Sequence, residues 1–530
     1  MIKNKNSKSI ANRCTGNILN SEEYSHPLYE TLLEYCERTY KDHTNIPFHM
    51  PGHKRNVEYM NFVNPFMIDI TEIDGFDNYH NPEGIIKESM ELATKVYGTR
   101  ESIYLVNGST VGLIAAIYGV TDKKDKVIVA RNCHKAVYNA LFHQELEAEY
   151  IYPQIHKDTG AYCGIDPCKL EEMLKKNIDT KAVIITSPTY ELVVSDIRII
   201  SEIVHKYNAV LIVDEAHGAH LPYMDMFPKS AIYEGADLVI QSLHKILPSL
   251  TQTAILHICS DRINSSKVHR YLGIYQSSSP SYIMMASMDN CTRFMCREET
   301  GRIIENYYNN LMALRRRING LNGISLVENY GYTMYDYDMS KLVIKSDFLN
   351  GSQLYNILHD RYGIQLEMAS ERYVIGMTSL CDNFEHYDIL YNALSEIATM
   401  SGCVDIVNEK GCVKEKKCIS GDEQENCDII KNDRIDMTDT RSEYIQINQA
   451  PAKKMTIYEA LNSNCETVKL VESKGMISYD YVYLYPPGSP IIVPGEVISD
   501  AIIRKIIQYI DMELNLIGIT EDGDITIVKK

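Results

Sequence analysis

The chain has 530 residues, of which 45% are hydrophobic and 23% charged, and this length is enough for two to four packed domains. Such a composition excludes wholesale disorder. Acidic side chains outnumber basic ones by 71 to 53, which gives a formal net charge of −18. This balance argues against broad binding to nucleic acid or to an anionic membrane, and it is compatible with a cationic small substrate.

The sequence predicts a cytoplasmic protein. Residues 1–20 lack the apolar run of a secretory signal, and no stretch approaches the roughly 18 apolar residues of a membrane span. The 14 cysteines are too sparse and irregular for a disulfide scaffold, so we interpret them as reduced thiols.

Strand and helix patterns alternate through the first half of the chain, after a polar arm at residues 1–22. This alternation predicts an α/β fold with a mainly parallel sheet covered by helices on both faces. The expected helices are Val111–Tyr118, Lys135–Glu145, Lys169–Lys175 and Ile197–Lys206. The expected strands are Ser102–Val106, Lys126–Ala130, Ala148–Tyr152, Ala182–Thr186, Ala209–Val213, Asp237–Gln241 and Ala254–Ile258.

The pattern changes in the second half. Residues 291–400 predict a long helix followed by a small α+β domain, which separates them from a large domain at 23–290. Residues 401–450 predict a linker or insertion, because Ser401–Glu443 is polar with few apolar runs. A terminal domain at 451–530 follows, with a helix expected from Gly495 to about Leu514.

Three loops after predicted strands carry residues suited to chemistry, and ligands of α/β sheets bind at such strand ends. The first is Asn107-Gly-Ser-Thr110, where Ser109, Thr110 and a helix N-terminus can form a cradle for a phosphate, although the same residues are common helix caps. The second begins with Asp214, a carboxylate at the end of a buried strand, which needs a cationic partner.

The third loop is Gln241-Ser-Leu-His-Lys245. A half-buried lysine amine has a lowered pKa and can attack a carbonyl, although a lysine at this place is more often an exposed surface residue. Phosphate cradle, carboxylate and lysine together match the needs of pyridoxal phosphate (PLP): an anchored phosphate, an acid opposite the ring nitrogen and an amine for the aldehyde. A helicase interpretation of Asp214-Glu-Ala-His217 fails, because the chain has no GxxxxGK[ST] phosphate loop.

At this point the sequence resembles the Orn/Lys/Arg decarboxylases of PLP fold type I, and most closely their shorter branch in Gram-positive bacteria. The resemblance covers most of residues 45–290 and the C-terminal domain. The segments that carry it are Ser242-Leu-His-Lys245, Asp214-Glu-Ala-His217, His49-Met-Pro-Gly-His-Lys54, Asp69-Ile-Thr-Glu-Ile-Asp-Gly-Phe-Asp77, His80-Asn-Pro82 with Gly84, Arg131-Asn-Cys-His-Lys135, Ser187-Pro-Thr-Tyr190, Ser279-Pro-Ser-Tyr282, and Tyr485-Pro-Pro-Gly488 with Pro494-Gly-Glu496.

The resemblance implies a PLP-binding large domain, a C-terminal decarboxylase domain, and a homodimer or higher homo-oligomer whose active sites lie across the subunit interface. It implies that Lys245 carries the cofactor, Asp214 holds the ring nitrogen protonated, His217 binds the ring hydroxyl and His134 stacks on the ring. The alternative for His134 is a buried histidine whose hydrogen bonds go to the backbone. It also implies a phosphate site built by Ser109, Thr110, Ser242 and His244, together with Ser277 or Ser278 of the partner subunit.

The implied reaction is α-decarboxylation of a basic amino acid, with arginine favoured over lysine and ornithine and with Lys245 or His134 returning a proton to Cα. Glu367 is a candidate partner for the distal cation of the substrate, where a solvated edge carboxylate is the alternative. An aminotransferase or another PLP lyase is the other enzyme class considered, with Arg372 as a carboxylate clamp or simply a surface arginine. A non-enzymatic scaffold is disfavoured, because the cofactor-binding set is intact.

Two departures from the family pattern stand out. Glu191-Leu192 follows the Pro-Thr-Tyr motif where many relatives carry glycine, which leaves the geometry on the substrate side open. The segment at 401–443 has no counterpart in the pattern. Its four cysteines lack CxxC-like spacing, so we expect a solvated linker and no metal site there; they are Cys403, Cys412, Cys418 and Cys427.

Overall fold

The computed structural model describes residues 28–40, 45–56, 63–328, 335–400, 450–485, 488–512 and 514–529. The arm expected at 1–22 and the polar segment expected at 401–443, with its four cysteines, lie outside these residues. The predictions made for those two segments therefore stay predictions.

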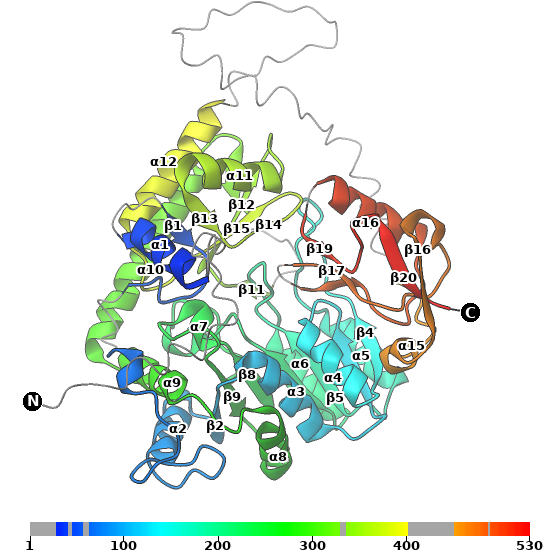
Figure 1. The fold of residues 1–530 in the computed structure, drawn as a ribbon, viewed down its shortest axis with the longest axis horizontal. Coiled ribbons are helices and arrows are strands. Elements are labelled where there is room, and N and C mark those ends of the chain that lie inside the picture. Colours follow the sequence, from blue (N-terminus) through cyan, green and yellow to red (C-terminus); the bar gives the residue numbers. More distant parts are fainter. Residues whose placement is uncertain are drawn as a thin grey trace, which may run out of the picture.

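A seven-stranded sheet forms the centre of the largest unit, in the order β2-β9-β8-β7-β5-β3-β4 (Figure 1). The five strands from β8 to β4 run parallel, and β9 is antiparallel to both of its neighbours. Each strand lies within one residue of its predicted range, so the predicted α/β fold is confirmed. The bounds are β2 Glu101–Leu105, β3 Lys126–Ala130, β4 Glu147–Ile151, β5 Ala182–Thr186, β7 Val210–Asp214, β8 Leu238–Gln241 and β9 Ala254–Ile258.

Helices pack on this sheet and bury its apolar strands. α3 is buried along most of its length, because it packs against β8, β9 and α8. Side-chain caps fix several helix starts; Asp166 and Asp196, for example, accept backbone N–H groups at the first turns of α5 and α6. The helices of this unit are α2 Ile85–Tyr97, α3 Gly108–Val120, α4 Lys135–His143, α5 Pro167–Lys176, α6 Ile197–Lys206, α7 Leu243–Ile246, α8 Ser265–Tyr275 and α9 Tyr282–Met295.

A smaller α+β unit follows the long helix α10, Glu298–Asn319. Its four-stranded antiparallel sheet has the order β10-β12-β15-β14, and α11 and α12 complete the unit (Figure 1). The bounds are β10 Ile324–Leu326, β12 Lys341–Ser346, α11 Gly351–Tyr362, β13 Ile364–Leu366, β14 Met368–Ala369, β15 Val374–Met377 and α12 Glu385–Met400. The short strand β11, Asp336–Tyr337, pairs with β6, Val193–Val194, of the large unit.

The N-terminal part of the chain joins this small unit to the large one. β1, Ile46–Phe48, pairs in parallel with β13, and α1, Leu28–Tyr40, precedes it. A few residues later the backbone N–H of Gly52 donates to the carbonyl of His244 (2.7 Å) in the large unit. The segment from β1 to Gly52, which the sequence predicts to belong to the large domain, therefore contacts both units.

The C-terminal unit contains two small antiparallel sheets, β16–β20 and β18-β17-β19, packed with α16 (orange to red in Figure 1). The helix expected from Gly495 begins only at Asp500, because Ser499 caps it and Gly495 has a φ of +89°. The bounds are α15 Ile457–Leu461, β16 Cys465–Lys469, β17 Val482–Leu484, β18 Pro490–Ile492, α16 Asp500–Asp511, β19 Leu516–Ile517 and β20 Asp524–Val528.

Candidate active site

A cavity of about 300 Å³ lies at the carboxyl ends of the parallel strands. The turn between β2 and α3 forms part of its wall, and so do the segments that follow β7 and β8. Eight residues singled out from the sequence line this one cavity: Ser109, Thr110, His134, Asp214, His217, Ser242, His244 and Lys245. Residues that are up to about 135 positions apart in the chain therefore meet at one place, as expected for ligand sites of α/β sheets.

One end of the cavity is suited to an anion. Gly108 starts α3 with a φ of +74°, a conformation that favours glycine, and the first N–H groups of the helix have no partner within it. The hydroxyls of Ser109 and Ser242 lie 2.7 Å apart. His244 Nδ1 hydrogen-bonds to the carbonyl of Thr253 (2.9 Å), which leaves Nε2 for a ligand. Burial lowers the pKa of His244 to about 4, so this ring is neutral near pH 7.

A carboxylate and a lysine line the same cavity. Asp214 ends β7 and is 3% exposed, and the backbone N–H of Ala216 donates to its Oδ1 (3.2 Å). Burial raises the pKa of Asp214, and the nearby Lys245 opposes this rise. Burial likewise lowers the pKa of Lys245, against the attraction of Asp214 and Glu367. The lysine is thereby poised closer to its neutral, nucleophilic form than a lysine in water.

Two histidines lie beside this pair. His217 Nε2 is 3.0 Å from Lys245 Nζ, while its buried Nδ1 has no hydrogen-bond partner among the described residues. Burial lowers the pKa of His217 well below its usual value. His134 caps α4, since its Nδ1 accepts the N–H of Ala136 (3.2 Å), and burial lowers its pKa to about 4. Both rings are therefore neutral near pH 7.

Further residues line the cavity for which the sequence predicts no role. Tyr190 follows β5, and its ring meets the ring of His217 edge-on at a centroid distance of 4.8 Å. Glu191, from the segment that departs from the family pattern, lines the cavity and accepts a hydrogen bond from Tyr373 (3.1 Å). Tyr190 could have been found from its place at a strand end. Ser489 could not, because it comes from the C-terminal unit.

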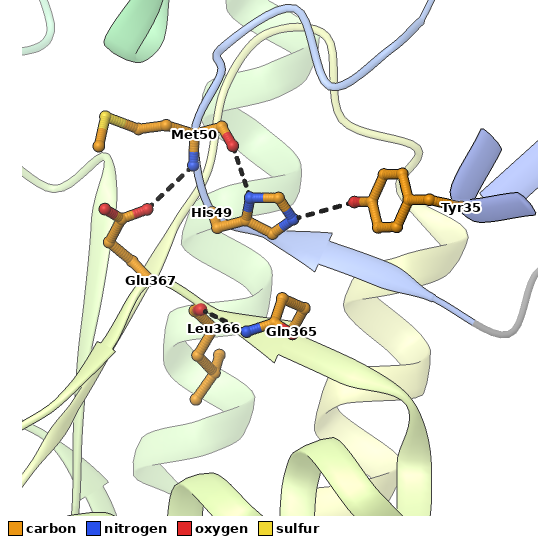
Figure 2. A pocket seen from close by; sticks show the side chains of 6 residues that line it. All are labelled: Tyr35, His49, Met50, Gln365, Leu366 and Glu367. Atoms are coloured by element: carbon orange, nitrogen blue, oxygen red, sulfur yellow. Dashed lines mark hydrogen bonds between the residues drawn. The ribbon is translucent and has the colours of Figure 1, made fainter. Parts of the chain in front are cut away.

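Glu367 lies outside this cavity, in a neighbouring pocket of about 450 Å³ (Figure 2). Its Oε1 accepts the hydroxyl of Tyr190 (2.7 Å), and its Oε2 accepts the backbone N–H of Met50 (3.0 Å). Tyr35 of α1 and His49 complete the side of the pocket that faces Glu367 in Figure 2. Tyr190 thus connects the two pockets, since it lines the first and binds the carboxylate of the second.

Arg372, the possible clamp for an aminotransferase substrate, lines neither pocket. Its Nη1 donates to the carbonyl of Asp158 (3.1 Å), and its Nε lies 3.5 Å from the carboxylate of Glu371. Because Arg372 does not line the cofactor cavity, it is not placed to clamp a substrate carboxylate there. The feature that favoured an aminotransferase is therefore missing from the site.

The described ranges contain no cluster of three or more side chains that could hold a metal ion. Within the same ranges, no helix is long and apolar enough to cross a bilayer.

The residues present fit PLP. An anion cradle, a buried carboxylate and a lysine of lowered pKa share one cavity, and His217 Nδ1 and Asn132 Oδ1 are buried there without a hydrogen-bond partner among the described residues. Buried polar atoms without a partner need an explanation, and inside a cavity a bound ligand supplies one. Fold and cavity together define an enzyme of the PLP fold type I class.

Within that class, two family models match the chain. The model of the Orn/Lys/Arg decarboxylase major domain matches residues 26–348, and the model of the C-terminal domain matches residues 437–517. The chain therefore belongs to the Orn/Lys/Arg decarboxylase family. This membership confirms the predicted enzyme class, a PLP-dependent decarboxylase of basic amino acids.

Individual relatives agree with the family assignment. The chain is 29% identical over 519 residues to an arginine decarboxylase of Bacillus subtilis, across 96% of this chain and 98% of the relative. It is 28% identical over 493 residues to an arginine decarboxylase of Halalkalibacterium halodurans, across 91% and 92%.

Among solved structures, the constitutive lysine decarboxylase of Escherichia coli has a TM-score of 0.71 at 17% identity, and the match covers 94% of this chain and 81% of that one. An alanine–glyoxylate aminotransferase of Nostoc has a TM-score of 0.53 at 14% identity, with 67% and 94% covered. At these identities the likeness concerns the fold alone.

Proposed function

We propose that this chain binds PLP in the 300 Å³ cavity and decarboxylates L-arginine to agmatine. One observation carries the proposal: the lysine, the buried carboxylate and the hydroxyl-rich helix start come from three separate strand ends and line a single cavity. When bound, PLP supplies the electron sink for the electrons that remain on Cα after loss of CO₂.

Each residue of the cavity has a defined task in this proposal. Ser109, Thr110, Ser242 and His244 would hold the phosphate, and Asp214 would stabilise the protonated form of the ring nitrogen. His217 accepts or donates a hydrogen bond at the ring hydroxyl through its unpartnered Nδ1. His134 would pack on the ring, where its neutral imidazole would add no competing charge.

The chain's own groups also handle protons. Burial lowers the pKa of Lys245, so its amine releases a proton more readily than an exposed lysine and can regain it later. Since Lys245 Nζ lies 3.0 Å from His217 Nε2, the histidine keeps the amine oriented between these events. Lys245 is therefore our choice for the group that returns a proton to Cα.

The pocket beside Glu367 is our candidate for the distal end of the substrate. Two hydrogen bonds, from Tyr190 and Met50, fix the Glu367 carboxylate in one orientation. A planar guanidinium needs such a fixed carboxylate for paired hydrogen bonds, whereas an ammonium group needs only a point countercharge. This difference favours arginine over lysine and ornithine, and the arginine decarboxylases among the relatives agree.

A cytoplasmic homodimer remains a prediction. The backbone N–H of Ser277 donates to Asn107 Oδ1 (3.0 Å) within the same protomer, so this serine already lies next to the phosphate cradle of its own chain. Whether Ser277 or Ser278 of the partner subunit reaches the phosphate can be tested by cross-linking at these positions.

Product analysis tests the proposed function directly. Purified holoenzyme is incubated separately with arginine, lysine and ornithine, and the amine formed is identified by mass spectrometry. We expect agmatine and CO₂. If cadaverine or putrescine is the main product, the enzyme is a decarboxylase but its substrate is lysine or ornithine and not arginine. If a keto acid forms, the enzyme is an aminotransferase.

A further inference from the structure

The C-terminal unit contacts the turn that carries His134. Arg131, at the start of this turn, places its Nη2 3.0 Å from Oε2 of Glu496 in the C-terminal unit. The two side chains are 5% and 1% exposed, so the ion pair is buried between the units. Removal of either side chain would leave the other charge buried without a partner, which strongly destabilises a folded protein. The contact therefore needs both residues.

Both members of the pair are fixed by their surroundings. The guanidinium of Arg131 lies over the rings of Tyr138 and Tyr150, at 5.7 and 5.4 Å from their centroids. Arg131 Nη1 also donates to the hydroxyl of Tyr138 (3.1 Å), which in turn donates to the carbonyl of Arg131 (2.7 Å). Neither the arginine side chain nor its backbone can shift without breaking these contacts.

On the other side, Glu496 Oε2 accepts the backbone N–H of Val493 (2.9 Å) as well as Arg131. Gly495 has a φ of +89°, and a Cβ at this position would lie 2.4 Å from the carbonyl oxygen of Met455. The tight turn therefore requires glycine and presents the glutamate toward the large unit. This gives a physical reason for the Pro494-Gly-Glu496 motif, which lies outside the cofactor cavity.

A second contact reaches the cavity itself. The hydroxyl of Ser489 donates to the carbonyl of Asn132 (3.1 Å), one residue after Arg131 and two before His134. Ser489, Asn132 and His134 all line the 300 Å³ cavity. The C-terminal unit thus contacts the His134 turn at two successive residues and forms part of the cavity wall.

We infer that Glu496 and Ser489 are positioning residues, which hold the Arg131–His134 turn so that His134 lies correctly in the cofactor cavity. The inference rests on the proposed function, because it assigns the C-terminal unit a role in placing the group that faces the PLP ring. The unit therefore completes the active site of its own chain and is needed for turnover.

Two variants of the full chain test this, Glu496→Gln and Ser489→Ala. Gln508→Ala is the matched control, because Gln508 on α16 also joins the C-terminal unit to the rest of the chain, through the carboxylate of Glu371 in the small unit (3.1 Å), but does not touch the His134 turn. For each protein we measure kcat, KM, the dissociation constant of PLP and the visible circular dichroism of the bound cofactor, which reports the orientation of its ring.

We expect Glu496→Gln to lower kcat about tenfold or more and Ser489→Ala about threefold, both with KM within a factor of about two and with altered visible circular dichroism. Glu496→Asp, which keeps the charge, should recover part of the loss. The control should match the wild type. If Glu496→Gln does not fold, the Ser489→Ala data decide.

The inference would be overturned if Ser489→Ala and Glu496→Gln both kept the kcat and the circular dichroism of the wild type. It would also be overturned if these two variants and the control lost activity equally, because that result would indicate a merely structural interface. A wild-type protein that binds no PLP or forms no amine would instead refute the proposed function.

Discussion

Asp214 is a buried carboxylate whose removal should affect chemistry much more than folding. Burial raises its pKa, because a charge is costly at this place, and an amide of the same shape fits the same space. An amide cannot stabilise a protonated ring nitrogen. We therefore expect Asp214→Asn to lower kcat roughly 100-fold or more, the scale of losing one preorganised electrostatic contact.

Steady-state kinetics and a thermal melt of Asp214→Asn check this prediction. The melting temperature should stay within a few degrees of the wild type. Near-native decarboxylation by the variant would show that Asp214 does not have the proposed role at the ring nitrogen.

Lys245 should be the residue that holds the cofactor covalently. Its lowered pKa and its place in the cavity make it more nucleophilic than an exposed lysine. Reduction of the yellow holoenzyme with borohydride should fix PLP on the peptide that contains Lys245, as identified by mass spectrometry. A label on another lysine, for example Lys341, would show that the site is assigned wrongly.

Glu367 should govern substrate affinity and not the chemical step, because it lies beyond Tyr190 from the cofactor cavity. We expect Glu367→Gln to raise the KM for arginine about tenfold, or ~1.4 kcal/mol, with kcat within a factor of about three. Tyr190→Phe is the control, since it removes one hydrogen bond to the carboxylate but keeps the charge, and its KM should rise less. An unchanged KM in Glu367→Gln would exclude this carboxylate from substrate binding.

At the level of elements, the strands were predictable because central strands of a parallel sheet are buried on both faces and therefore apolar throughout, as in Ala209–Val213. The meeting of eight candidate residues in one cavity was predictable for a related reason, since strand ends of one sheet converge. Ser489 and the pocket around Glu367 were not, because they depend on how separate units dock. The predicted start of α16 was also wrong, because the sequence pattern does not reveal the left-handed turn at Gly495.

The short helix α7, which carries Lys245, depends on a close approach of the N-terminal segment. A Cβ on Gly52 would lie 2.3 Å from the carbonyl carbon of Ile246, and the N–H of Gly52 donates to the carbonyl of His244 (2.7 Å). We expect Gly52→Ala to displace α7, lower the melting temperature and weaken PLP binding at least tenfold.

Absorbance titration with PLP and a thermal melt measure both effects of Gly52→Ala. Gly273→Ala in α8 is the control, because its Cβ would meet no atom within 4 Å and alanine favours a helix by about 0.5–1 kcal/mol. Wild-type PLP affinity in Gly52→Ala would mean that α7 tolerates a shift of this segment.

At the scale of the whole molecule, Lys341 joins the small unit to the large one and should make stability depend on pH. It is completely buried on β12, and its Nζ donates to the carbonyl of Tyr190 (3.1 Å). Burial lowers the pKa of Lys341 to about 8, against the attraction of Asp338. Between this pH and the usual 10.5 of lysine, the unfolded chain binds a proton that the folded chain does not, so the contribution of Lys341 to stability rises with pH.

We expect the stability of the wild type relative to Lys341→Met to improve from pH 7.5 to 10.5, by up to roughly 3 kcal/mol. The melting temperatures of both proteins across this pH range measure the difference in their stability. Groups that titrate alike in both proteins do not contribute to this difference. Lys345→Met, partly exposed on the same strand, is the control and should follow the wild type. A constant difference between wild type and Lys341→Met would mean that Lys341 keeps its proton in the folded protein.

The pairing of β1 with β13 has a consequence for biosynthesis. The Glu367 carboxylate and the backbone of Met50 that it binds are separated by 317 positions in the chain, and the strands beside them are equally distant. During translation β1 leaves the ribosome long before its partner exists, and its edge stays open while the large sheet assembles. Contacts of such long sequence separation form slowly. The pocket beside Glu367 should therefore be among the last parts of the enzyme to mature, and nascent chains stalled before β13 should be prone to aggregate or to recruit chaperones.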